Sequence, residues 1–141
     1  MTREALDAVY RATTYRVFVA SDAAIDIRIG ERSPRLDALL SKHGCNAWVF
    51  VTAWNPGSQP LQRAENEGRQ SELLALLCER GLQWLAGSGV PPDAAWHAED
   101  SVLVLGIDSD EGVAIGRRFG QVAIVAGTVG CPAELVYCDR W

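Results

Sequence analysis

The residues best suited to do chemistry form two polar groups around a turn. The first is Thr52-Ala53-Trp54-Asn55-Pro56-Gly57, which follows an almost continuously apolar run, and the second is Glu65-Asn66-Glu67-Gly68-Arg69-Gln70. Ligands of open α/β sheets bind beyond the carboxyl ends of central strands, near the start of the next helix. This order of segments therefore predicts a polar binding site between a strand end and a helix start.

Helical spacing places three of these side chains on one face of the expected helix. The apolar stripe that ends at Leu77 leads back, in steps of three, four and seven residues, to Asn66, Arg69 and Gln70. A buried polar surface needs partners, because each unpaired group costs about 1–3 kcal/mol. Those partners would be Thr52 and Asn55, or a bound ligand.

The chemistry of Arg69 points to an anion, because its planar fork of donors binds a carboxylate or phosphate through two bonds. A purely structural interpretation stays open. Asn55 before Pro56 is a common start of a turn, and Arg69 has nearby acidic residues with which to pair at the surface: Glu65, Glu72 and Glu99.

Catalysis is the second interpretation of the polar residues. Asp100 or Glu65 would act as the general base of a small hydrolase or transferase, and His97 with Ser101 is a further candidate pair. Gly87-Ser88-Gly89 is followed by prolines rather than a helix, so it is no dinucleotide fingerprint, and the chain has no phosphate-binding loop. No catalytic residue, cofactor or metal is assigned.

Hydrophobic periodicity and turn residues predict the elements that position these groups. Helices are expected over residues 3–13, 34–43, 60–80 and 109–119. Strands are expected over residues 15–20, 24–29, 47–54, 82–86, 102–107, 122–126 and 134–138. A turn is expected at Ser21-Asp22-Ala23, and residues 87–99 have no periodicity and are expected to form a long loop.

This order predicts an α+β (or α/β) fold, with one globular domain over residues 1–141 and three to four helices packed on a mixed β-sheet. Ile25, Ile27 and Ile29 alternate with Asp26 and Arg28, which is typical of an antiparallel hairpin with one wet face. The edge of the hairpin over residues 15–29 is a candidate contact for a homo-oligomer.

The charge and hydropathy of the chain argue against two classes of binding partner, nucleic acids and membranes. Thirteen Lys and Arg against eighteen Asp and Glu give a formal charge of −5, which argues against nucleic acid. No apolar run is long enough for a membrane span, and the first eleven residues lack a signal peptide's apolar segment, so we expect a cytoplasmic protein.

The four scattered cysteines are expected as thiols, with a Cys131–Cys138 disulfide or a zinc site at His43 and Cys45 as alternatives.

The chain also resembles a bacterial family known as "domain of unknown function 3293". The segments that carry the resemblance are Ala12-Thr13-Thr14-Tyr15, Val51-Thr52-Ala53-Trp54-Asn55-Pro56, Glu65-Asn66 with Arg69, residues 100–107 and residues 119–124. Members often have Glu-Ser where this chain has Asp100-Ser101, and Gln-Asn where it has Gln121-Val122. The resemblance implies a small cytoplasmic protein and a common site that adds Asp100, Ser101 and Gln121 to Thr52, Asn55, Asn66 and Arg69.

Three hypotheses follow in this order: a module that binds a small, nucleotide-like anion, a small hydrolase or transferase, and a protein-interaction domain. The first is expected to use Arg69 for the anion and neutral side chains for hydrogen bonds.

Overall fold

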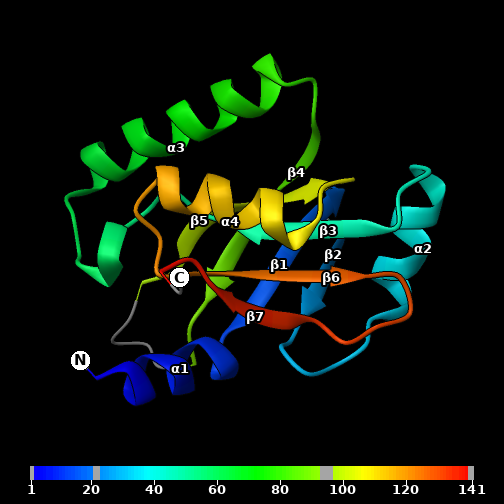
Figure 1. The fold of residues 1–141 in the computed structure, drawn as a ribbon, viewed down its shortest axis with the longest axis horizontal. Coiled ribbons are helices and arrows are strands. Elements are labelled where there is room, and N and C mark those ends of the chain that lie inside the picture. Colours follow the sequence, from blue (N-terminus) through cyan, green and yellow to red (C-terminus); the bar gives the residue numbers. More distant parts are fainter. Residues whose placement is uncertain (1, 21–22, 93–96, 140–141) are drawn as a thin grey trace.

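One seven-stranded β-sheet forms the centre of the computed structural model, which describes residues 2–20, 23–92 and 97–139 (Figure 1). The strands are β1 (Thr14–Ala20), β2 (Ala23–Ile27), β3 (Ala47–Val51), β4 (Gln83–Val90), β5 (Glu99–Leu105), β6 (Ala123–Thr128) and β7 (Glu134–Tyr137). The helices are α1 (Arg3–Ala12), α2 (Pro34–Lys42), α3 (Arg63–Glu79) and α4 (Ser109–Arg118), with a short 3-10 turn, η1, at Pro56–Ser58. The order in the sheet is β2-β1-β4-β5-β3-β6-β7.

The sheet confirms the α+β class, and every pair of neighbouring strands is antiparallel. It curls until its two edges approach one another. Ile29, just after β2, forms a parallel bridge with Ala133, just before β7, and the Gly30 N–H donates to the Ala133 carbonyl at 2.8 Å. In the described part of the chain this bridge is the one parallel pairing of an otherwise antiparallel sheet.

Helices cover both faces of the curled sheet (Figure 1). The apolar stripe of α3, which includes Leu73 and Leu77, packs with α4 against one face of the central strands. On the other face, Leu36 and Leu40 of α2 pack against the side chains of a second core. Two cores separated by one sheet agree with the predicted buried character of the run from Ala47.

The expected loop over residues 87–99 is too long, because β4 continues to Val90 and β5 begins at Glu99; residues 93–96 of it lie outside the described residues. Glycines replace side chains here because the sheet is crowded. A Cβ at Gly87 would lie 2.6 Å from the Arg16 carbonyl oxygen and 2.8 Å from the Phe50 ring. Glycine in a strand marks such a close approach. Of the expected turn at residues 21–23, Ser21 and Asp22 lie outside the described residues.

Helix starts follow the sequence closely. Ser33 before Pro34, and Asp108 three residues before Glu111, are patterns that predict N-caps at these two positions. Both are confirmed, because the Ser33 hydroxyl accepts from the Leu36 N–H at 3.2 Å and the Asp108 carboxylate accepts from the Glu111 N–H at 2.9 Å. The strand expected to reach Trp54 instead ends at Val51. The backbone beyond Val51 bonds to side chains rather than to a neighbouring strand, as described below.

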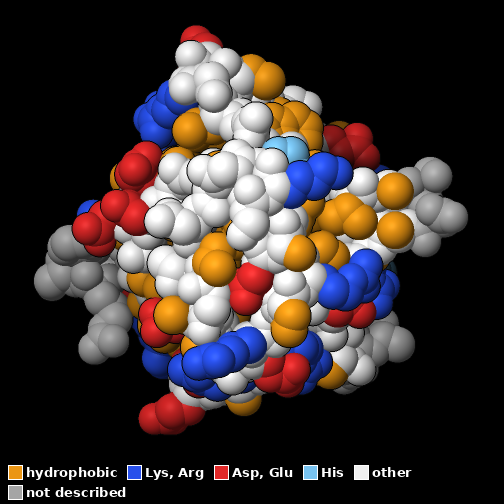
Figure 2. Space-filling model, turned by 90° about the vertical axis from the view of Figure 1, so that its right-hand side faces the viewer, with side chains coloured by type: hydrophobic (Ala, Val, Ile, Leu, Met, Phe, Trp, Pro, Cys, Tyr) orange, Lys and Arg blue, Asp and Glu red, His pale blue; other side chains and the backbone are white. Residues whose placement is uncertain are grey.

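No disulfide joins Cys131 and Cys138, so the disulfide alternative is wrong. The zinc alternative lacks ligands, since no group of three His, Cys, Asp or Glu side chains gathers among the described residues. No helix in that same part of the chain is both long and apolar enough to cross a membrane. Figure 2 shows Lys and Arg side chains interspersed with Asp and Glu on one face of the molecule, so charge is mixed there.

Candidate functional site

A cavity of about 220 Å³ lies between α1 and the sheet, on the face that α2 also packs against but in the part that α2 does not cover. We call it the α1 cavity. Leu6, Val9 and Tyr10 of α1 line one side of it, and no residue of α1 is fully buried. This side of α1 therefore faces a hollow rather than a packed core.

The walls of the α1 cavity are mostly apolar, and its polar groups come from several elements. The apolar lining consists of Leu6, Val9, Phe50, Val51, Pro60, Pro91, Ala123, Ile124, Val125 and Leu135, with Gly89 between them. The polar lining consists of Tyr10, Thr13, Tyr15, Thr52, Asn55, Ser58, His97, Glu99, Ser101 and Gln121. A largely apolar pocket with a few convergent polar groups is the usual form of a small-molecule site.

The loop after β3 is held by side chains of α3. The Ala53 N–H donates to Gln70 Oε1 at 3.0 Å, and the Asn55 N–H donates to Asn66 Oδ1 at 2.9 Å. Asn66 is only 1% exposed, so the predicted buried polar face of α3 is confirmed. These bonds satisfy backbone groups that a longer strand would have paired, which explains why β3 ends early.

Asn55 is the centre of this loop. Its backbone is left-handed, with φ 48° and ψ 63°, a conformation that asparagine tolerates better than most residues. Its Oδ1 accepts from the Leu61 N–H at 3.0 Å and from Asn66 Nδ2 at 2.8 Å. Its own Nδ2 donates to Glu99 Oε1 at 2.9 Å. Asn55 therefore connects the scaffold of the loop to a carboxylate in the α1 cavity.

Arg69 and Gln121 hold the other side of the loop. Arg69 donates through Nε to the Ala53 carbonyl at 2.9 Å and through a second nitrogen to the Phe119 carbonyl. Gln121 Nε2 donates to the Trp54 carbonyl at 3.0 Å and to the Phe119 carbonyl at 3.3 Å. The guanidinium thus ties the loop to the end of α4, and Arg69 does not line the α1 cavity.

The structure divides the seven residues of the predicted site into two sets. Thr52, Asn55, Ser101 and Gln121 line the α1 cavity. The remaining residues, Asn66, Arg69 and Asp100, do not line it. The side chain of Asp100 is exposed, and its carbonyl accepts from the Thr52 hydroxyl at 2.6 Å. The alternative base, Glu65, is exposed on α3, outside the cavity.

Among the described residues that line the cavity, Glu99 is the acidic one. Burial raises the pKa of its carboxyl, and the hydrogen bond from Asn55 opposes that shift. No Lys or Arg lies among the described lining residues, and His97 is the one basic side chain among them. The cavity therefore has the chemistry of an acid in apolar surroundings, rather than that of a cationic anion site.

Sequence reasoning missed Glu99, Tyr10, Tyr15 and Ser58 as members of the site. Glu99 and Ser101 are two residues apart on β5, so they point to the same face. The alternation of Glu99, Asp100 and Ser101 is a usable signal of a strand, which the expected loop over residues 87–99 leaves out. The Tyr10 hydroxyl shares a hydrogen bond with Ser58 Oγ at 3.1 Å, a partner that lies 48 residues away in the sequence.

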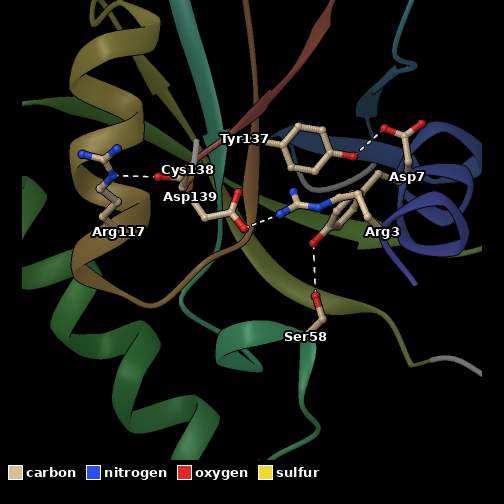
Figure 3. A network of polar contacts seen from close by, with 8 residues as sticks. Arg3, Asp7, Ser58, Arg117, Tyr137, Cys138 and Asp139 are labelled. Atoms are coloured by element: carbon tan, nitrogen blue, oxygen red, sulfur yellow. Dashed lines mark hydrogen bonds and ion pairs between the residues drawn. The ribbon is translucent and has the colours of Figure 1, made fainter. Parts of the chain in front are cut away.

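Polar contacts between the two ends of the chain hold α1 over the cavity (Figure 3). Arg3 pairs with Asp139, and its guanidinium carbon lies 4.4 Å from the centre of the Tyr137 ring. The Tyr137 hydroxyl donates to Asp7. These groups are largely exposed or half-buried, so they hold the helix less firmly than a buried core would.

Comparison with known proteins gives one family. The model of the family described as "Protein of unknown function (DUF3293)" matches residues 51–124, more than half of the 141 residues. The chain belongs to the DUF3293 family. No curated protein and no solved structure matches it significantly.

The DUF3293 segment coincides with much of the site. It includes the loop after β3, all of α3, and the cavity residues Glu99, Ser101 and Gln121. Helix α1, which covers the cavity, lies outside the matched residues. The family description supplies no activity, so function has to come from the geometry of the site.

Proposed function

We propose that this DUF3293 protein binds a compact small molecule in the α1 cavity. The observation that carries the proposal is the Glu99 carboxyl, which sits in mostly apolar walls with Asn55 as its hydrogen-bond donor. A cavity of about 150 Å³ is enough to hold benzene in another protein, so about 220 Å³ suits a somewhat larger molecule. Polar groups that converge in such a hollow orient a ligand.

Binding of an anion by Arg69 is not part of this proposal and remains an untested prediction. Two nitrogens of Arg69 already serve backbone carbonyls, and the carboxyl in the cavity repels an anion. Cytoplasmic location also stays a prediction.

A ligand screen followed by nuclear magnetic resonance tests the proposal. We expect a bound fragment to shift the amide signals of β5, β6 and α1. Ala123→Leu extends a side chain into the cavity and is expected to weaken binding by about tenfold or more, because the ligand then has to displace packed atoms. The matched control is Ala75→Leu on the exposed face of α3. Signals that shift elsewhere, or equal affinity in both variants, would contradict the proposal.

An enzyme that uses Glu99 for acid–base chemistry is the second candidate. The raised pKa of a half-buried carboxyl is the observation that favours it, since general acids are tuned in this way. Glu99 replaces Asp100 and Glu65 in that role, because both of those lie outside the cavity. Turnover that survives Glu99→Gln but is lost in Asp100→Asn would contradict the assignment.

Assembly through the hairpin at residues 15–29 is the candidate that we favour least. Part of the outer edge of β2 is already in use, because the Ala24 carbonyl accepts from Arg35 at 3.0 Å. The residues after β2 bond to Ala133. A dimer through this edge remains an untested prediction.

A further inference from the structure

Six hydroxyl groups line the α1 cavity, and four of them direct their hydrogens away from a ligand, to backbone carbonyls: Thr13 to Val9 at 2.7 Å, Tyr15 to Tyr10 at 2.8 Å, Thr52 to Asp100 at 2.6 Å and Ser101 to Glu99 at 3.0 Å. The other two, Tyr10 and Ser58, share one hydrogen bond, which leaves one hydrogen of that pair available. A hydroxyl that has donated its one hydrogen still has lone pairs to accept with. These four groups therefore meet a ligand as acceptors.

The amide side chains of Gln121 and Asn55 also leave mainly acceptors for a ligand. Gln121 directs its Nε2 hydrogens to two backbone carbonyls, and its Oε1 accepts no hydrogen bond from any of the described residues. Asn55 uses Oδ1 for two scaffold donors and Nδ2 for Glu99. The free hydrogen-bonding capacity of the cavity is thus dominated by oxygen lone pairs.

Charge adds to this asymmetry. Among the described residues, Glu99 forms no ion pair, and Asn55 is its hydrogen-bond partner. The titratable groups that line the cavity around it are Tyr10, Tyr15 and His97. An ionised carboxylate in apolar walls is costly unless a cation pairs with it. A ligand with an ammonium group would supply both the charge and up to three donors.

We infer that the α1 cavity binds an organic amine, with its ammonium group against Glu99 and its hydrocarbon body against the apolar walls. This inference rests on the proposed function and narrows it to one ligand class. The Ser101 and Gln121 oxygens are the further acceptors for the ammonium N–H groups. Leu6, Val9 and Val125 are among the apolar residues that contact the body.

Two series of probes with a constant body and a changing head group test the inference. They are 2-phenylethylammonium, 2-phenylethanol and phenylacetate, and n-hexylammonium, 1-hexanol and hexanoate. Titration calorimetry and nuclear magnetic resonance would measure affinity and location for the whole chain. We expect at least one ammonium compound to bind about tenfold or more tightly than its alcohol, with no binding of the carboxylate, because charged hydrogen bonds are stronger than neutral ones.

Two charge-matched variants assign the effect to one carboxyl. Glu99→Gln keeps the size of the side chain and an acceptor for Asn55, and we expect it to lower ammonium affinity by about tenfold while alcohol affinity changes less than about twofold. Asp100→Asn removes the same charge from the neighbouring exposed residue and is expected to change neither affinity.

The outcomes separate the inference from the proposed function. Binding of an alcohol or carboxylate in the cavity, with the ammonium equal or weaker, overturns the amine and leaves the binding function standing. If no probe of either series binds in the cavity, both are overturned. Should Glu99→Gln fail to fold, the wild-type comparison within each series still decides.

Discussion

Asn66 shows how one buried amide can fix the conformation of a functional loop. It lies on α3, yet its side chain bonds to both the backbone N–H and the side-chain oxygen of Asn55. Since Asn55 in turn donates to Glu99, Asn66 affects the cavity indirectly, through Asn55.

Substitution of Asn66 by alanine is expected to lower the free energy of unfolding by about 2 kcal/mol, because it leaves the part-buried Asn55 N–H without its acceptor and removes the bond to Asn55 Oδ1. Urea unfolding would measure the change. Glu65→Ala, at the adjacent exposed position, serves as the control and is expected to stay within about 0.5 kcal/mol of wild type. Equal effects of the two substitutions would show that the network does not stabilise the fold.

Glu99 makes stability depend on pH with a defined sign. Burial raises the pKa of its carboxyl in the folded chain, so the folded state holds this proton at pH values where the unfolded state has lost it. The free energy of unfolding is therefore expected to fall as pH rises from the ordinary glutamate pKa to the raised one. Unfolding in urea at a series of pH values checks this, and Glu99→Gln is expected to remove that part of the slope. Asp100→Asn should retain the slope, and parallel profiles for wild type and Glu99→Gln would contradict the assignment.

At the scale of elements, α4 lies so close to the sheet that only glycine fits at its contact. A Cβ at Gly112 would lie 2.7 Å from both Ile124 and Val49. By contrast, a Cβ at Gly68, in the middle of α3, would meet nothing within 4 Å.

These two glycines therefore predict opposite effects of one substitution. Gly112→Ala is expected to destabilise the protein by about 1–3 kcal/mol, because the helix has to move off the sheet. Gly68→Ala is expected to stabilise it by about 0.5–1 kcal/mol through helix propensity alone. Thermal or urea unfolding of both variants would measure the difference, and stabilisation by Gly112→Ala would show that α4 packs less closely than described.

Elements with a local cause were predictable from the sequence. The N-caps at Ser33 and Asp108 and the apolar stripe ending at Leu77 needed only neighbouring residues, and the structure confirms them. The continuation of β4 through Gly87 has no local cause, because Gly87 pairs with Val17 and Ser101, which lie far away in the sequence. The same holds for the site. Thr52 and Asn55 were predictable because they follow an apolar run, whereas Glu99 was not, because the strand that became β5 was expected to begin three residues later.

At the scale of the whole molecule, the two ends of the chain meet beside the cavity (Figure 3). Asp7 and Tyr137 are separated by 130 residues in sequence and bond directly. No local sequence pattern predicts a contact between such distant residues. The position of α1 depends on that contact, so neither this position nor the α1 cavity was predictable from the sequence.

Tyr137→Phe is expected to loosen α1 while the sheet stays intact. Loss of this charge-assisted hydrogen bond is expected to make amide exchange in α1 several times faster. Hydrogen exchange followed by nuclear magnetic resonance would measure it, with the amides of α3 in the same sample as the internal control. Unchanged exchange in α1, or equal acceleration in α3, would contradict this role.

The position of β3 between β5 and β6 has a consequence for how the chain folds. Both partners of β3 come later in the sequence, so one edge of the strand stays unpaired until Leu105 has been synthesised and the other until Thr128 has been synthesised. Pairings between distant segments slow folding to the range of milliseconds to seconds. During that interval the apolar run Ala47–Val51 presents open edges to other chains. Nascent or truncated chains that stop short of β6 therefore carry the greatest risk of aggregation, and chaperones are expected to act on them at this stage.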